Sequence, residues 1–193
     1  VGSEMCIRDR LSIINDIVDL ASIESGQMKL KMRSVNINNS LRSLCEQFSY
    51  KEKHQKVKLK LKTTLNGDDA EIMTDPTKLV QILSNLINNA LKFTVEGRID
   101  IGYKLKNACL EFYVKDTGIG IPEVYQPKVF QRFYQVENSV SSQYSGTGLG
   151  LSICKAYTEL LGGEIWLRSR PGEGTTFNFT IPYIRKNAEQ AEN

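Results

Sequence analysis

The stretch from Asp75 to Thr94, DPTKLVQILSNLINNALKFT, carries the strongest helical pattern in this chain. Asp75 can accept hydrogen bonds from the first free backbone N–H groups, and Pro76 suits the first helical position. Apolar residues then recur at helical spacing: Leu79, Val80, Leu83, Leu86, Ile87, Ala90 and Leu91. We therefore predict one helix here, with its apolar stripe packed on the core.

The opposite face of this predicted helix is rich in amides. Asn85, Asn89 and Lys92 stand at i, i+4 and i+7, so two amides and one ammonium share a face. A solvated helix face would more usually carry Glu and Lys, because Asn is a mediocre helix former. The face is either an unusual surface or a binding site, and the glycine-containing segments downstream favour a site.

The composition is that of a soluble globular domain. The 193 residues are 40% hydrophobic and 24% charged, which allows one sizeable core. The net charge of +3 does not by itself indicate a nucleic-acid partner, and we expect none. No apolar run approaches the roughly 20 residues of a membrane span, and nothing at the start resembles a signal peptide. We expect a cytoplasmic domain, and whether a parent protein is anchored in a membrane upstream is left open.

The four cysteines support that expectation. They are far apart and show no paired spacing: Cys6, Cys45, Cys109 and Cys154. We interpret them as reduced thiols rather than as a disulfide framework or a zinc site.

The N-terminal segment divides at residue 10. Residues 1–10, VGSEMCIRDR, show no periodicity, and we expect a non-native scar. From Leu11 to Ser25, apolar residues recur at steps of 3 and 4, which predicts a helix whose apolar side packs against a partner helix. Gly26 is expected to end this helix. A helix this short is marginal alone, so we expect it to belong to a longer element that begins upstream.

The next segments predict a helix from Val35 to Tyr50 and a strand from Lys56 to Lys62. In KVKLKLK, lysine alternates strictly with Val or Leu, which is typical of a half-buried strand with a lysine face. A nucleic-acid patch is the alternative, but no aromatic residue is interleaved for base stacking. An edge strand guarded by lysines is favoured. Asn66-Gly67 is a turn signal before a short strand at 71–74.

The remaining elements follow from alternation and from glycine or proline breaks. We predict strands at 98–106 and 109–115 with a turn at 106–108, short helical turns within 123–133, and a mobile loop at 135–145. A helix through Leu161, a stop at Gly162-Gly163, strands at 164–169 and 175–182, and a disordered tail at 185–193 complete the prediction.

Two glycine-rich segments, Asp116–Gly120 (DTGIG) and Gly146–Gly150 (GTGLG), indicate an anion site beside the amide-rich helix. Glycine lets backbone N–H groups approach phosphate closely, and a helix N-terminus after Gly150 adds a favourable dipole. GTGLG lacks the spacing of a dinucleotide fingerprint, and no P-loop pattern occurs in the chain. Alone it would most often be structural, but its combination with DTGIG and the asparagines favours a phosphate ligand.

The ordered motifs NLINNALKFT, DTGIGIP, FQRFYQ and SGTGLGLSI resemble the ATP-binding domain of sensor histidine kinases, of the GHKL ATPase superfamily. LSIINDIVDLASIESGQMKL resembles the end of the second helix of their dimerisation hairpin. The resemblance implies an α+β fold, a two-layer α/β sandwich of the Bergerat ATP-binding type, with a mixed sheet on three helices. It implies hairpin residues at 11–33, a catalytic ATP-binding domain at 34–184, and a lid at about 135–146.

The resemblance also implies site residues. It places the amide oxygen of Asn89 on Mg²⁺, Lys92 on the phosphates of ATP, and Asn85 in the polar network beside the metal. It makes Asp116 the acceptor of a hydrogen bond from the adenine amino group, a role that suits a group able only to accept.

Further roles are implied for the glycine and aromatic motifs. Gly118 and Gly120 are expected to keep the adenine pocket open. The residues expected to face the triphosphate are Gly146, Thr147, Gly148, Leu149 and Gly150. Phe130 and Phe133 are expected to anchor the lid, partly as core aromatics. Arg132 is expected either to reach the γ-phosphate or to remain solvated.

The same site indicates a phosphodonor. Water-hydrolysing relatives such as DNA gyrase carry a Glu where this chain has Asn85, and an amide cannot take a proton from water. The family's nucleophile is a histidine on the first hairpin helix, which we expect to be absent here. His54 has no acidic neighbour after it and is interpreted as a solvated linker residue.

We therefore expect ATP binding but no autophosphorylation by this chain alone. The implied partners are the phosphoacceptor hairpin of a homodimeric parent and a response-regulator receiver domain. The alternatives are a GHKL ATPase clamp of the gyrase or mismatch-repair type, and a degenerate module that no longer binds nucleotide.

Overall fold

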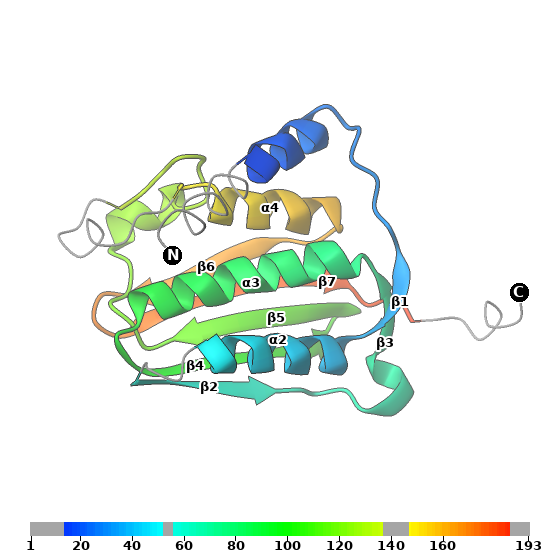
Figure 1. Ribbon diagram of the computed structural model, residues 1–193, viewed down its shortest axis with the longest axis horizontal. Helices are drawn as coiled ribbons and strands as arrows, with labels where there is room; N and C mark the ends of the chain where they lie inside the picture. Colours follow the sequence, from blue (N-terminus) through cyan, green and yellow to red (C-terminus); the bar gives the residue numbers. More distant parts are fainter. Residues whose placement is uncertain (1–13, 52–55, 137–146, 186–193) are drawn as a thin grey trace, which may run out of the picture.

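The computed structural model describes residues 14–51, 56–136 and 147–185. Its main body has two layers, a five-stranded sheet and, on one face of it, three α-helices of the described part (Figure 1). These helices are α2 (Ile37–Lys51), α3 (Pro76–Phe93) and α4 (Gly150–Leu160). The predicted α+β sandwich, a mixed sheet on three helices, is confirmed.

The sheet has the strand order β2-β4-β5-β7-β6. The strands are β2 (Lys56–Lys62), β4 (Glu96–Lys106), β5 (Cys109–Asp116), β6 (Ile165–Arg170) and β7 (Gly174–Pro182). β2 pairs with β4 in parallel, and every other neighbouring pair is antiparallel, so the sheet is mixed. β2 lies at an edge, as its lysine alternation predicts.

A second, two-stranded sheet corrects one prediction. β1 (Arg33–Asn36) pairs antiparallel with β3 (Glu71–Thr74), and Val35 lies opposite Ile72. The helix predicted from Val35 therefore begins two residues later, at Ile37. The four residues of β1 are extended because they pair with a strand far along the chain, a tertiary effect that local spacing does not reveal.

The predicted central helix is confirmed as α3. The Asp75 side chain accepts from the backbone N–H groups of Thr77 (3.0 Å) and Lys78 (3.2 Å), and Pro76 is the first helical residue. The fully buried side chains of the helix are Leu79, Ile82, Leu83, Leu86, Ile87 and Ala90. The apolar stripe thus faces the sheet, and the amide-rich face of the helix points away from it.

The core lies between α3 and the inward residues of β4, β5 and β7. Phe112 and Phe179 stack with ring centroids 4.9 Å apart, and neither is exposed. Ile99 and Ile101 of β4 are equally buried beside them. Burial of each such side chain contributes roughly 1.5–3 kcal/mol, so this layer fixes the sheet under α3.

The turns agree with the glycine and asparagine signals. Asn107 (φ 50°) and Ala108 (φ 58°) join β4 to β5 where the turn was predicted. Gly162 (φ 82°) follows the end of α4. Short 3₁₀ turns occur at η1 (Gly67–Ala70), which leads into β3, and at η2 (Glu123–Lys128). The predicted strand ends are correct to within two residues, but the predicted mobile loop lies mainly outside the described residues.

The described part of the chain begins with a helix at residues 14–24, which lies beside α4 (Figure 1). Gly26 (φ 66°) follows it, as predicted. Ile14 and Val18 of the predicted seam are 56% and 55% exposed. Among the described residues, no helix is both long and apolar enough to span a membrane.

Candidate functional site

The amide-bearing half of α3 connects the two glycine segments. Near the middle of the helix, Asn85 donates through Nδ2 to the carbonyl oxygen of Gly150 at 3.4 Å. At the end of the helix, the carbonyl oxygen of Phe93 accepts from the backbone N–H of Ile119 at 3.2 Å. The two anchor points are eight residues apart, roughly 12 Å along the helix. The structure therefore places both glycine segments against α3, one near its middle and one at its end.

Asn89 and Lys92 lie between these two anchor points, and both are half-buried. No described residue forms a hydrogen bond with the Asn89 amide, and no carboxylate of the described part pairs with Lys92. Burial lowers the pKa of the Lys92 ammonium, whose Nζ lies 5.1 Å from the centre of the Phe93 ring. An amide and a cation are thus held partly out of water with their polar atoms available to a ligand.

Asp116, the last residue of β5, is only 5% exposed. Its Oδ1 accepts from the backbone N–H groups of Gly118 (2.9 Å) and Thr175 (3.1 Å), whereas no described residue donates to Oδ2. Burial raises the pKa of this carboxyl above its ordinary value, and the two backbone bonds only partly oppose that effect. The side chain is fixed through one oxygen and keeps the other as a free acceptor.

The glycines of the first segment pack closely on neighbouring backbone. A Cβ on Gly118 would lie 2.2 Å from the carbonyl oxygen of Phe93, and one on Gly120 would lie 2.0 Å from that of Arg170. These two glycines therefore hold the turn after Asp116 against α3 and β6. Their predicted role in keeping an adenine pocket open stays a prediction.

Gly174 and Thr175 are site residues that the sequence analysis missed. Thr175 donates its N–H to Asp116, and a Cβ on Gly174 would lie 2.1 Å from the carbonyl oxygen of Asp116. The available signal was Gly172-Glu173-Gly174 between the strands predicted at 164–169 and 175–182, and the sequence analysis assigned no role in the site to this segment. Nothing local shows that this turn supports a carboxylate 59 residues before Thr175.

The second glycine segment is held by the aromatic motif. The carbonyl oxygen of Gly148 (φ 71°) accepts from the N–H of Phe133 at 3.0 Å, and a Cβ on Gly148 would lie 2.7 Å from the Phe133 backbone. The N–H of Leu149, predicted to face phosphate, lies 3.2 Å from the Thr147 hydroxyl oxygen, which accepts from it. No side chain of the described residues caps α4, so within this part of the chain its first N–H groups are available to an anion. Gly146 lies outside the described residues.

The aromatic motif itself splits into a packed and an exposed residue. Phe130 packs edge-on against Phe177, with centroids 6.2 Å apart, whereas Phe133 is 66% exposed at a φ of 57°. Between them, the Arg132 guanidinium forms an ion pair with the carboxylate of Glu24 on the helix at 14–24. Arg132 is thus engaged by an acidic side chain here.

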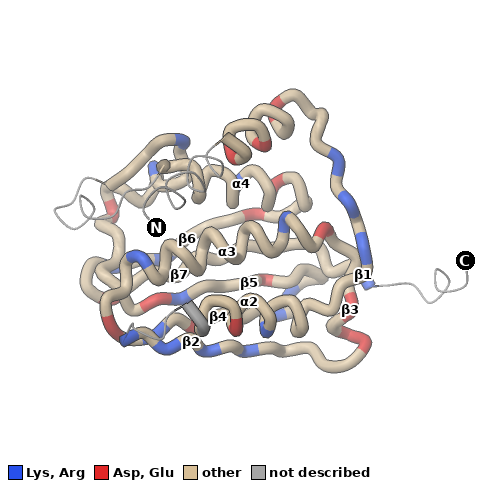
Figure 2. Tube along the Cα trace, in the orientation of Figure 1, with Lys and Arg blue, Asp and Glu red and all other residues tan. Residues whose placement is uncertain are grey.

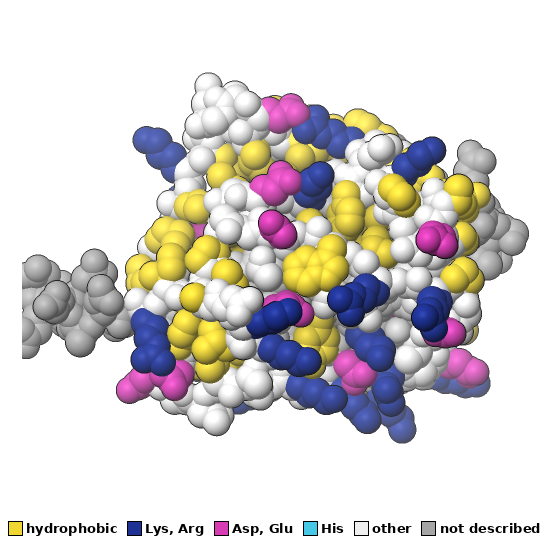
Figure 3. Space-filling view, turned by 180° about the vertical axis from the view of Figure 1, so that it is seen from behind, with side chains coloured by type: hydrophobic (Ala, Val, Ile, Leu, Met, Phe, Trp, Pro, Cys, Tyr) yellow, Lys and Arg dark blue, Asp and Glu magenta, His cyan; other side chains and the backbone are white. Residues whose placement is uncertain are grey.

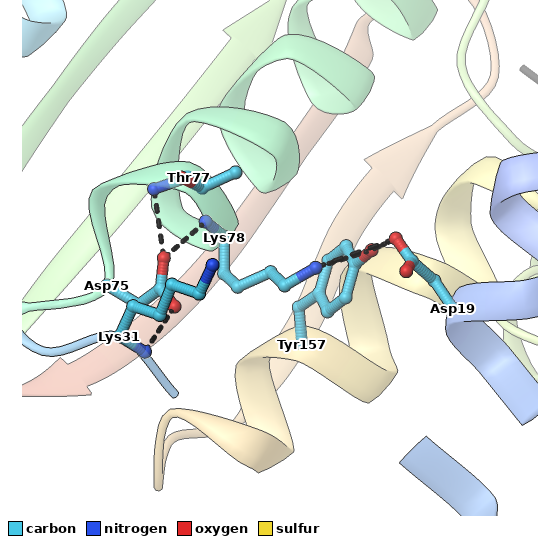
Figure 4. A network of polar contacts seen from close by, with 6 residues as sticks. All are labelled: Asp19, Lys31, Asp75, Thr77, Lys78 and Tyr157. Atoms are coloured by element: carbon cyan, nitrogen blue, oxygen red, sulfur yellow. Dashed lines mark hydrogen bonds and ion pairs between the residues drawn. The ribbon is translucent and has the colours of Figure 1, made fainter. Parts of the chain in front are cut away.

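A second polar contact docks the same helix on the domain (Figure 4). The Tyr157 hydroxyl of α4 donates to the Asp19 carboxylate, and Lys78 Nζ lies 3.2 Å from the Tyr157 oxygen and 3.5 Å from Asp19. Burial and the adjacent carboxylate both raise the pKa of the Tyr157 phenol. Figure 4 also shows Asp75, which caps α3 and accepts from the Lys31 N–H at 2.8 Å.

This fold and this cluster of amides, glycines and one buried carboxylate define a class of ATP-binding domain. The family model described as "Histidine kinase-, DNA gyrase B-, and HSP90-like ATPase" matches residues 74–185, more than half of the chain. The chain belongs to that family, and it is the ATP-binding catalytic domain of the histidine kinase type.

Curated relatives and solved structures agree with this assignment. The circadian input-output histidine kinase CikA of Synechococcus elongatus is 39% identical over 173 residues, which are 89% of this chain and 23% of CikA. The signal transduction histidine-protein kinase BarA of Escherichia coli K12 is 34% identical over 183 residues, 92% of this chain and 20% of BarA. The chain thus spans less than a quarter of the length of these relatives.

Among solved structures, full-length ShkA in complex with AMPPNP superposes with a TM-score of 0.81 at 27% identity, over 93% of this chain and 37% of ShkA. The catalytic domain of the histidine kinase ThkA gives a TM-score of 0.69 at 29% identity, over 80% of this chain and 97% of that domain.

Proposed function

We propose that this chain binds Mg·ATP and acts as the phosphodonor of a sensor histidine kinase. The γ-phosphoryl group would pass to a histidine of a phosphoacceptor hairpin and then to a response-regulator aspartate. One observation supports this most strongly: α3 holds two half-buried polar side chains, Asn89 and Lys92, between the N-terminus of α4 and the buried carboxylate of Asp116. Among the described residues, Asn89 has no hydrogen-bond partner and Lys92 has no carboxylate partner. Residues 34–184 would form the catalytic domain and 11–33 the hairpin segment.

At one end of this site Asp116 binds the base. Its Oδ1 is already occupied by two backbone donors, so Oδ2 accepts from the adenine amino group. At the other end, the free N–H groups of α4 and the glycine segment before it bind the phosphates, and Lys92 supplies the positive charge. The desolvation of Lys92 strengthens that attraction, because opposite charges interact more strongly away from water.

The residues present fit a magnesium ion that arrives with the nucleotide. In the described part of the chain, no group of three His, Cys, Asp or Glu residues could hold a metal by itself. The Asn89 amide oxygen is a hard neutral ligand, and Mg²⁺ usually combines one or two protein oxygens with waters and phosphate oxygens. Asn89 would hold the ion, which when bound neutralises charge on the phosphates.

Asn85 argues against hydrolysis of ATP by water at this site, because its amide can take no proton from water. Its Nδ2 is instead used to hold the start of α4 against α3. We infer that the domain positions ATP and leaves the nucleophile to the hairpin.

Arg132 approaches the γ-phosphate only after it leaves Glu24. The two side chains are 45% and 57% exposed, so exchange of one anion for another needs no unfolding of the core. The helix at 14–24 and the nucleotide would then compete for one guanidinium.

The test combines two measurements on the full chain. Calorimetry with Mg·ATP should show saturable binding that Asn89→Ala weakens about tenfold or more, as expected for loss of a metal ligand supported by the site. Radiolabelled γ-phosphate should then reach the histidine of a hairpin domain from a related kinase, supplied separately. Binding without any transfer would refute the phosphodonor role, and steady ATP hydrolysis without the hairpin would favour an ATPase clamp.

A further inference from the structure

The sheet has a second face, which the helices do not cover (Figure 3). Strand side chains alternate between faces, and the core takes the odd-numbered residues of β2, β4, β6 and β7 and the even-numbered residues of β5. The remaining residues point outward in rows fixed by the strand register. One such row, read from β2 to β6, is Lys62, Gly102, Tyr113, Asn178 and Trp166.

The centre of this row is aromatic. A Cβ on Gly102 would lie 2.6 Å from the Tyr113 hydroxyl and 2.9 Å from the adjoining ring carbon, so the end of the Tyr113 side chain lies over Gly102 of β4. Trp166 stands two strands from Tyr113, roughly 10 Å away at the usual strand spacing. Asn178 lies between them. Two half-buried rings with an amide between them form a flat patch that can take an apolar side chain.

The rows around this patch are strongly cationic (Figures 2 and 3). Three cations on this face are paired: Arg98 with Asp100 (3.2 Å), Lys106 with Glu111 (3.6 Å), and Arg170 with Glu173 of the following turn (3.7 Å). Among the described residues, these outward cations have no carboxylate partner: Lys56, Lys58, Lys60, Lys62, Lys104, Lys115 and Arg168. A chain whose net charge is only +3 thus concentrates unpaired positive charge on one face.

We propose that this basic sheet face, made of these seven cations with Tyr113 and Trp166, binds an acidic protein segment that carries an apolar anchor. The cations attract the carboxylates of that segment, and the two rings receive the anchor. Trp and Tyr are enriched among the residues that carry most of the binding energy at protein interfaces, and opposite charge around them sets partner choice and association rate.

The pattern favours a protein over a nucleic acid. Asp100 on β4 and Glu111 on the neighbouring strand β5 stand within the cationic rows, opposite Lys115 and Lys104, so a phosphate backbone laid across these two strands would lie against carboxylates. Carboxylates on a folded or extended protein segment can be spaced to avoid them. The inference goes beyond ATP binding, since Asp116 and the amides of α3 belong to the opposite side of the sheet.

Two charge-matched double variants test the proposal. Lys60→Glu/Lys115→Glu reverses two cations of the basic sheet face, and Lys29→Glu/Lys155→Glu reverses two exposed lysines elsewhere. The probe is a fluorescein-labelled synthetic peptide in which Asp and Glu alternate with Phe and Leu, measured by anisotropy. Wild type and the Lys29/Lys155 variant should bind it alike, and the Lys60/Lys115 variant about tenfold or more weakly. Calorimetry with Mg·ATP should give the same affinity for all three proteins.

Three results would overturn the proposal. They are no saturable binding of the acidic peptide, an equal loss of binding in both double variants, and tighter binding of a labelled oligothymidylate than of the peptide. A peptide with the same charge but Ser in place of Phe and Leu tests the aromatic patch, and it should bind more weakly to wild type. Equal binding of the two peptides would contradict the anchor role of Tyr113 and Trp166.

Discussion

The phenol of Tyr157 on α4 donates a hydrogen bond to the carboxylate of Asp19 on the helix at 14–24, and Lys78 of α3 contacts both groups. Tyr157 is fully buried, and the side chains of Lys78 and Asp19 are 13% and 28% exposed. This contact is therefore much better shielded from water than a surface ion pair. It joins the N-terminal helix to the two helices that carry the candidate site.

Tyr157→Phe should loosen this docked helix. Removal of the hydroxyl leaves Asp19 and Lys78 without their shared partner, and a hydrogen bond to a charged group contributes about 1.5–3 kcal/mol. Hydrogen exchange should accelerate in residues 14–24, and the urea midpoint should fall. Glu159→Gln, on α4 like Tyr157, is the control. It removes the ion pair between Lys155 and Glu159, whose side chains are 52% and 61% exposed. Unchanged exchange in residues 14–24 of Tyr157→Phe would show that the contact does not hold the helix.

Glu24→Gln should raise the affinity for ATP. The substitution removes the carboxylate that occupies Arg132, so the guanidinium becomes available to the γ-phosphate without prior loss of an ion pair. We expect a several-fold gain for ATP and a smaller gain for ADP, which lacks that phosphate. Arg132→Gln should abolish the difference between the two nucleotides. If Glu24→Gln and wild type bind ATP with equal affinity in calorimetry at low salt, the proposal that Glu24 and ATP compete for Arg132 is wrong.

Asp116 should make nucleotide binding sensitive to acid. Burial raises its pKa above the ordinary 3.8, so on acidification the carboxyl gains a proton at a higher pH than an exposed aspartate would. The protonated group is no longer a pure acceptor, so affinity for adenine nucleotides should fall as the pH decreases through that raised pKa. The ratio of ATP to ITP affinity isolates this effect from titration of the phosphates, because ITP lacks the amino donor.

This ratio should decline toward one in acid for wild type and stay near one at all pH values for Asp116→Asn. A wild-type ratio of ATP to ITP affinity that does not vary with pH would contradict the proposal that Asp116 binds the adenine amino group.

Local signals predicted most of the fold because the residue pattern within most elements favours the structure that the element adopts. The Asp75-Pro76 start of α3 and the lysine alternation of β2 each identify one element without tertiary information. β1 was missed because Val35 and Asn36 are extended only through pairing with β3. Spacing on α3 also predicted that Asn85, Asn89 and Lys92 share a face. It could not show that Thr175 supports Asp116 or that Glu24 engages Arg132, since both contacts join segments far apart in the chain.

Gly148→Ala should destabilise the domain, whereas Gly150→Ala two residues later should not. Gly148 has a φ of 71°, and a Cβ there would lie 2.7 Å from the Phe133 backbone, which cannot move as a side chain can. Alanine at a positive φ costs more than about 1 kcal/mol even without a clash. Gly150 begins α4 at an ordinary φ, with only ordinary van der Waals contact to Asn85 at 3.9 Å. Thermal unfolding should therefore separate two substitutions that are identical in chemistry and only two residues apart. An equal loss of stability for both would mean that Phe133 and Gly148 are not packed backbone to backbone, and that the aromatic motif does not hold the glycine segment in place.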